Sequence, residues 1–255
     1  MGKKDNKNKK ASFFKNRAKE LRDLEKSLES QFKIPEADYS PLFAAAKKLE
    51  EIAESSITPT KWGYSIQNLI LPLGSIRNIE PQGIRLKICI DCEIEAEIEK
   101  WENKKDDPFS NYSFHLSVFG EQNGIRYSRG FHIDRDSAIN SKECHPLYHL
   151  HFYDGLYDNG EALKDVRQNR GSVNIRTPRF SHYPLDIVLG IGFYLLNFHR
   201  IDAFKNLINN DIRFSRLYAD SQKRILEPYY LAISGSLESK LVIWEDYRLL
   251  CPQIV

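Results

Sequence analysis

The sequence predicts an α+β protein, in which one antiparallel sheet of about five to six strands is flanked by an N-terminal helical hairpin and by C-terminal helices. Three observations carry this prediction. Apolar residues recur at steps of three and four before residue 60, alternate with polar residues through the middle of the chain, and return to helical spacing after residue 184. Strands that follow one another without intervening helices favour this order over an alternating βαβ one.

The composition limits the classes of protein to consider. A chain of 255 residues can bury a core, and its 41% hydrophobic and 28% charged residues are ordinary for a globular protein, which excludes global disorder. The net charge is +2, but the first ten residues alone carry +4, so the remainder is mildly acidic. We therefore expect no globally basic surface for nucleic acid, and we expect residues 1–11 to form a disordered basic tail.

The next segment, 12–57, is predicted to be a helical hairpin. Its first helix has an apolar stripe, and Pro35 ends it. A second helix is expected from Pro41 to about Ser55, with Ser40 as its N-cap. The stripe of the first helix consists of Phe14, Ala18, Leu21, Leu28 and Phe32. The rest of the chain, 58–255, is predicted to be a single α+β domain.

The clearest strand pattern covers residues 84–98, where every second residue is apolar and the opposite phase is charged or polar. Such a strand has one buried face and one wet face. Further strands are expected over 64–71, 112–118, 125–133, 147–152 and 173–176. The Asn123-Gly124 pair predicts a hairpin turn between two of them.

Helical spacing returns near the C-terminus. A nearly all-apolar helix is expected over 185–198, introduced by Ser181 and Pro184, with Asp186 in its first turn. Two more helices are expected over 203–209 and 215–226, the second ending before Pro228. Residues 244–251 fit either a last helix or an edge strand.

The same apolar segment bears on location. Residues 185–198 are interrupted by Asp186 and Asn197 and are shorter than the ~20 residues that a membrane span needs. Four cysteines in a chain of this length are ordinary for a reducing compartment. These features predict a cytoplasmic protein without a membrane partner.

The histidine-rich strand at 145–152 contains the candidate metal ligands. His149 and His151 are two residues apart, so on a strand they face the same side and could share a divalent transition metal. A third ligand would come from His182, His132 or Asp154. The alternative is that these histidines are hydrogen-bonded residues on an ordinary sheet, because the H-x-H spacing is a short motif.

A second candidate site lies where a short strand precedes the apolar helix. Arg176 and Arg179 would bind an anion beside the unpaired N–H groups of the helix N-terminus, and His182 is the candidate catalytic acid or base. The structural alternative is that Ser181 caps the helix and the arginines pair with the acidic strand. Residues 164–179 also form a basic run that could hold single-stranded nucleic acid.

Other patterns carry less weight. The acidic stripe on the wet face of the strand at 84–98 is too extended to converge on metal ions, so cross-strand pairing with Arg126 or Arg129 explains it better. Cys89 and Cys92 have C-x-x-C spacing, but on a strand they face opposite sides and cannot share a zinc ion.

Two hypotheses for function follow. The first is an intracellular interaction or nucleic-acid-binding module without a complete catalytic motif, which recruits a partner protein through the N-terminal helices or nucleic acid through 164–179. The second is a metal-dependent hydrolase of phosphoesterase or nuclease type, which uses the histidines at 145–152 and the anion site at 176–182.

Overall fold

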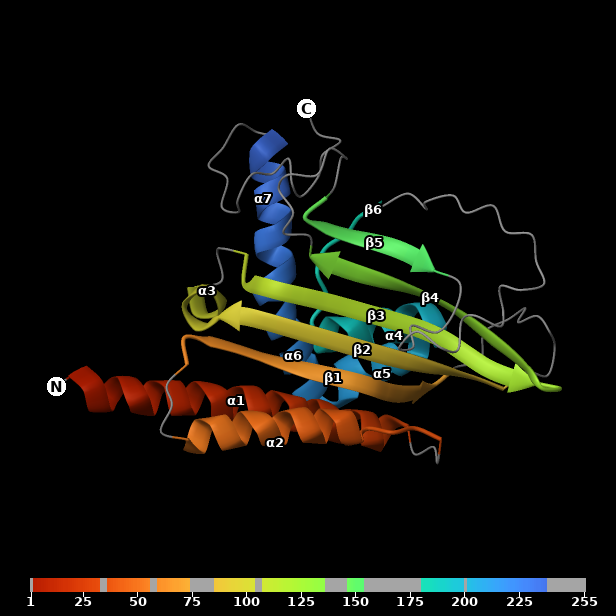
Figure 1. Cartoon of the computed structure of the whole chain (residues 1–255), viewed down its shortest axis with the longest axis horizontal. Helices are drawn as coiled ribbons and strands as arrows, with labels where there is room; N and C mark the ends of the chain where they lie inside the picture. The colour runs from red at the N-terminus through yellow and green to blue at the C-terminus, as the bar shows by residue number, and fades with distance from the viewer. Residues whose placement is uncertain are drawn as a thin grey trace.

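The computed structural model of the chain describes residues 2–32, 36–55, 59–73, 85–103, 107–135, 146–153, 180–199 and 201–237. Within these ranges the strands form one antiparallel sheet of six strands, in which each strand pairs with the next one along the chain. Figure 1 shows this meander. The strands are β1 (Lys61–Pro72), β2 (Arg85–Glu97), β3 (Phe109–Gln122), β4 (Ile125–Arg135), β5 (Tyr148–Tyr153) and β6 (Phe180–Ser181). The predicted α+β class is confirmed.

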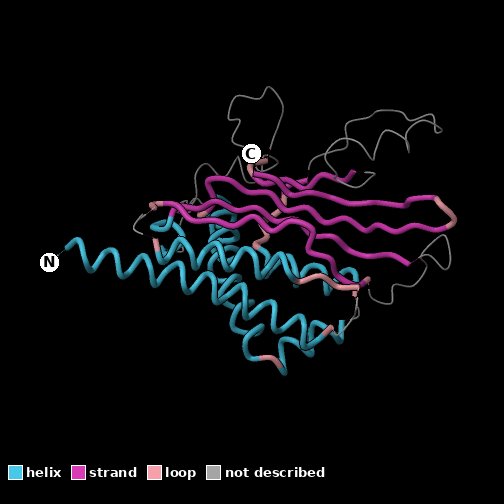
Figure 2. Tube along the Cα trace, turned by 60° about the horizontal axis from the view of Figure 1, so that its bottom comes forward, coloured by secondary structure: helices cyan, strands magenta, loops and turns pink. Residues whose placement is uncertain are grey.

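The helices cover one face of the sheet (Figures 1 and 2). Apolar and polar residues alternate along each strand, so the apolar side chains face the helices and the polar side chains face away from them. Gly190 of the apolar helix, for example, lies against the ring of Phe114 on β3. The helices are α1 (Gly2–Gln31), α2 (Ser40–Glu54), α3 (Ile98–Asn103), α4 (Ile187–Phe198), α5 (Ile201–Asn210), α6 (Ile212–Ser221), the π-helix η1 (Gln222–Leu226) and α7 (Glu227–Leu237).

The hairpin between β3 and β4 turns at Asn123-Gly124, as predicted. Both residues have positive φ, 54° and 74°, which is what the tight turn of a two-residue hairpin demands. The turn fixes the register of the two strands, which pairs His115 with His132 and Ser113 with Asp134. This register is what brings residues far apart in the sequence onto one patch of the polar face.

β1 contains a bulge. Its register with β2 shifts between Ile66 and Leu69, so that Gln67 and Asn68 oppose the single residue Asp91. Asn68 has a φ of 59°, and its backbone N–H donates to Asp91 Oδ1 at 2.6 Å. The bulge switches the phase of the strand, because Ile66 and Leu69 are both buried although they are three residues apart.

The N-terminal helices share the core of the sheet. Buried side chains of α1 and α2, such as Leu24 and Leu42, belong to the same hydrophobic cluster as those of the strands. α1 begins at Gly2, so residues predicted as a disordered tail form its first turns. Lys9 pairs with Glu102 of α3 at 3.6 Å, and Lys10 Nζ donates to the Pro59 carbonyl at 3.3 Å. The division of the chain at residue 58 stays a prediction.

Two details of the C-terminal helices differ from the prediction. Asp186, not Ser181, is the N-cap of α4, because its carboxylate accepts the Leu189 N–H at 2.8 Å while Ser181 belongs to β6. Pro228 does not end the helical run. The π-helix η1 stands directly before α7, and this wider turn accommodates a residue that has no N–H to donate.

No helix in the described ranges is both long enough and apolar enough to span a membrane. The predicted strand at 173–176 and the predicted element at 244–251 lie outside the described residues.

Candidate metal centre

The polar face of the sheet carries two neighbouring rows of polar side chains, most of them ionisable. Cross-strand pairing aligns Asp91, His115, His132 and His151 in one row, from β2 to β5. The next row runs from Glu93 through Ser113, Asp134 and His149 to Ser181. Because residues paired across antiparallel strands lie about 5 Å apart, each row brings members on adjacent strands within reach of one another.

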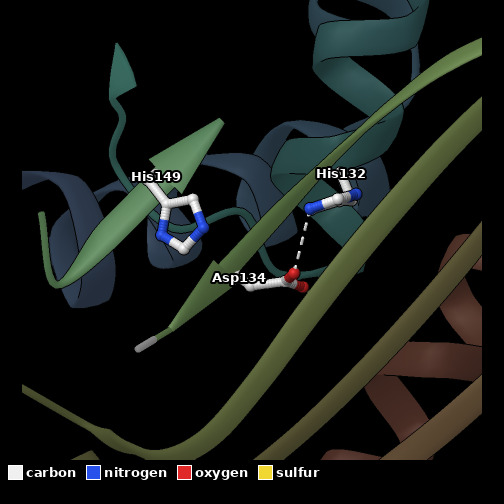
Figure 3. A group of neighbouring side chains, drawn as sticks. All are labelled: His132, Asp134 and His149. Atoms are coloured by element: carbon white, nitrogen blue, oxygen red, sulfur yellow. Dashed lines mark ion pairs between the residues drawn. The ribbon is translucent and has the colours of Figure 1, made fainter. Parts of the chain in front are cut away.

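Three of these side chains form a compact group. His132 and Asp134 come from β4 and His149 from β5, and all three project from the polar face (Figure 3). Each residue offers one ligand atom, and these atoms all lie within 4.8 Å of one another. His132 Nε2 is 3.2 Å from Asp134 Oδ2. We call this group the triad.

The donor set and spacing fit a divalent transition metal. Two imidazoles and one carboxylate are ligands that zinc, iron and nickel accept. Ligand atoms at ~2.1 Å from a tetrahedral ion are about 3.4 Å apart, so the His132–Asp134 separation of 3.2 Å suits an ion. The other separations, which reach at most 4.8 Å, must shorten for all three atoms to share it. His149 is buried at 6% exposure and Asp134 is half-buried, so packing restricts the first ligand more than the second.

His115 borders the triad from β3. Its Nε2 lies 3.7 Å from Asp134 Oδ1, and its ring centroid lies 5.4 Å from that of His132. Burial lowers the pKa of His115 below the ordinary value for an imidazole, the nearby Asp134 carboxylate opposes this shift, and His132 adds to it. The Asp134 carboxylate thus lies between two imidazoles, with Oδ1 nearest to His115 and Oδ2 nearest to His132.

The structure distributes the predicted metal ligands differently. His149 belongs to the triad, and so does His132, one of the three residues considered as a third ligand. His151 faces the same side and pairs with His132, with ring centroids 5.1 Å apart, but it lies next to the triad and outside it.

His182 lies on the other side of the sheet. Its ring contacts Phe193 of α4, with centroids 6.4 Å apart, and Phe193 packs against Phe131 on the apolar face. His182 Nδ1 is 2.6 Å from the Tyr183 carbonyl, and burial lowers the pKa of its ring. The structure therefore does not bring His182 to the triad.

The predicted anion ligands Arg176 and Arg179, the basic run at 164–179 and the alternative ligand Asp154 lie outside the described residues.

The acidic stripe of β2 is engaged in local contacts. Glu95 pairs with Lys61 of β1 at 2.7 Å, and Asp91 Oδ1 accepts the Asn68 N–H. Pairing of the stripe with Arg126 or Arg129 stays a prediction. Cys89 and Cys92 lie in opposite phases of β2, and both are buried free thiols.

Asp134 is the ligand that the sequence reasoning missed. The signal was present as His132-Ile133-Asp134, because alternation on a strand places both polar side chains on one face. What was missing was the register of β4 with β5, which pairs Asp134 with His149.

Comparisons with protein-family models, with curated proteins and with solved structures find no match for this chain. The case for a function therefore depends on the geometry of the triad.

Proposed function

We propose that this chain is a metal-dependent hydrolase that holds a divalent transition metal between His132, Asp134 and His149. The observation that supports the proposal is the convergence of three ligand atoms of suitable chemistry within 4.8 Å. Structural zinc sites are closed by four protein ligands, whereas three protein ligands leave a position for water or substrate. A metal in such a set lowers the pKa of bound water and polarises a carbonyl or phosphoryl oxygen.

The position of the triad also supports a catalytic role. The triad projects from the polar face of the sheet, the described helices cover the other face (Figures 1 and 2), and the Asp134 side chain is 35% exposed. A substrate on this face would meet Asp134 first, because the His132 side chain is only 16% exposed and His149 only 6%.

For the substrate we propose a phosphate ester, in a phosphoesterase or nuclease reaction. Arg176 and Arg179 support this choice, because guanidinium groups bind phosphate oxygens in a bidentate manner. Arg179 directly precedes β6, and Ser181 of β6 pairs with His149.

We also propose a reducing, cytoplasmic setting, which the free thiols of Cys89 and Cys92 support.

The donor set favours one other class of reaction. Two histidines and one carboxylate also hold iron(II) in oxygenases, so the identity of the metal separates the two classes. A binding module built on the N-terminal helices stays a prediction from the sequence.

The first experiment is elemental analysis of the purified, tag-free protein, followed by zinc and iron(II) titration after chelation. We expect one equivalent of metal per chain. His132→Ala, Asp134→Ala and His149→Ala should each weaken binding by at least about tenfold. His151→Ala is the matched control, because it removes an imidazole on the same strand and the same face, one that contacts the His132 ring but offers no ligand atom to the triad.

Two results would overturn the proposal. One is a protein that binds no divalent metal even after refolding with excess zinc or iron(II). The other is a loss of affinity in His151→Ala as large as that in His149→Ala. If metal binds at the triad, a screen with chromogenic phosphate monoesters and diesters, comparing wild type with His149→Ala, tests the hydrolase reaction itself.

A further inference from the structure

A buried polar network lies directly behind the triad, on the apolar face of the sheet. Asp107, which precedes β3, accepts a hydrogen bond from the Tyr148 hydroxyl at 2.5 Å and one from Arg135 Nε at 3.1 Å. Its Oδ1 also accepts the Phe109 N–H at 3.1 Å. Tyr148 is fully buried and Asp107 is 9% exposed. We call Asp107, Arg135 and Tyr148 the clamp.

The clamp joins the two strands that carry the triad. Arg135 directly follows Asp134 on β4, and Tyr148 directly precedes His149 on β5. Asp134–His149 and Arg135–Tyr148 are consecutive pairs in the β4–β5 register. Neighbouring residues on a strand face opposite sides of the sheet. The clamp therefore connects the end of β4 to the start of β5 on the apolar face, while the ligands project from the same two strand ends on the polar face.

The chemistry of the clamp makes it a rigid connection. The Tyr148 hydroxyl is fully buried and donates a hydrogen bond to Asp107 Oδ1. A buried carboxylate left without donors is costly, so the network resists separation of β4 from β5. Hydrogen bonds to a charged group are among the stronger ones in proteins.

We propose that the clamp positions Asp134 and His149 for metal binding, by holding β5 against β4 at the Arg135–Tyr148 pair, which is adjacent to the pair formed by the two ligands. This inference rests on the proposed function, because it assigns Asp107, Arg135 and Tyr148 as positioning residues of the same metal site. None of the three supplies a ligand atom. Arg135 and Tyr148 lie on the strands that carry the ligands, and Asp107 connects these two residues.

The test compares Tyr148→Phe with Ser221→Ala. Both variants remove a hydroxyl that donates to a buried carboxylate, since Ser221 Oγ donates to Asp186 Oδ2 at 2.7 Å in the helical layer. Both should lower the melting temperature. Only Tyr148→Phe should weaken cobalt(II) binding, by about tenfold or more, and change the absorption spectrum of the cobalt(II)-loaded protein.

A second variant guards against misfolding of Tyr148→Phe. Arg135→Lys keeps the positive charge at a partly exposed position but loses the planar fork of the guanidinium. We expect the same change in the cobalt(II) spectrum, with a smaller loss of affinity.

A measurement without metal separates failure of this inference from failure of the proposed function. Hydrogen exchange of the peptide 148–153 in the metal-free protein should be faster in Tyr148→Phe and unchanged in Ser221→Ala. Exchange and cobalt(II) affinity that both match wild type would overturn the role of the clamp and leave the metal site standing. If wild type bound no cobalt(II), the proposed function would fail, and with it the positioning of ligands by the clamp.

Discussion

His115 Nε2 lies 3.7 Å from Asp134 Oδ1, whereas His132 Nε2 lies closest to the other oxygen of that carboxylate. A carboxylate that gives one oxygen to a metal is oriented by what contacts the second. We therefore predict that His115→Ala weakens zinc binding about tenfold while the stoichiometry stays the same. Isothermal titration calorimetry at neutral pH measures both quantities.

The control for this prediction is Ser117→Ala, which alters the same face of β3 two residues further along. Its zinc affinity should match that of wild type. A complete loss of binding in His115→Ala would instead identify His115 as a direct ligand.

The N-cap of α6 predicts an acid-dependent loss of stability. Asp211 accepts the Arg213 N–H at 2.9 Å and pairs with the Arg213 guanidinium at 2.9 Å, which lowers the pKa of Asp211 to about 2. Since the folded-state pKa lies below the unfolded one, the stabilisation is present at neutral pH and is lost as the pH falls from about 4 to about 2. Asp211→Ala should lower the free energy of unfolding by about 1 kcal/mol at pH 7.

Urea unfolding of wild type and Asp211→Ala at several pH values tests this. The difference in the free energy of unfolding between the two proteins should shrink as the pH falls from about 4 to about 2. Asp202→Ala, in the first turn of α5, is the control for loss of a carboxylate near a helix start. A difference that persists unchanged at the acid end would contradict the assignment.

Close packing of α4 predicts that replacing either of its two glycines destabilises the folded protein. A Cβ at Gly190 would overlap the buried ring of Phe114, and one at Gly192 would overlap the ring of Tyr218. We expect Gly190→Ala and Gly192→Ala each to cost about 1–3 kcal/mol, because the rings must move within a packed core. Thermal unfolding measures the loss, and Gly124→Asn in the β3–β4 turn should cost less, because a Cβ there meets no atom and Asn tolerates a positive φ better than most residues.

A largely buried ion-pair network predicts how α1 is attached to the rest of the molecule. Glu20 Oε1 lies 2.7 Å from Arg17 Nη2 and 3.7 Å from Arg224 Nη2, and Arg224 is 7% exposed. Glu20→Ala leaves two guanidinium groups without their shared carboxylate, so we expect a loss of about 3 kcal/mol.

The control is Glu50→Ala, whose pair with Arg22 also anchors α1 but is more exposed. That variant should lose at most about 1 kcal/mol. Equal losses in chemical denaturation would show that the burial of the Glu20 network adds nothing.

The fold was predictable where one pattern persisted over many residues. The alternation in β2 and the apolar spacing of α1 and α4 are local properties, so a single segment reveals them. The N-cap of α4 was misplaced because Ser181 and Asp186 are both capping residues, and only the pairing of Ser181 with His149 assigns it to a strand.

The site was predictable only in part, because it depends on pairing between strands. His149 was found from the sequence, and His132 was one of several possible partners. The choice among the possible partners requires the register of β4 with β5, which depends on pairing between residues distant in the sequence. His182 was grouped with the other histidines because it is close to them in sequence, yet it follows β6 and contacts the helical layer.

The bulge in β1 has a consequence for changes of chain length. Because Gln67 and Asn68 together oppose Asp91, β1 holds one residue more than its partner requires. Deletion of either one would remove the surplus and leave Ile66 opposite Cys92 and Leu69 opposite Ile90. Deletion of Tyr64 would instead turn Trp62 toward the wet face. We therefore expect natural variants that are one residue shorter in β1 to carry their gap at the bulge.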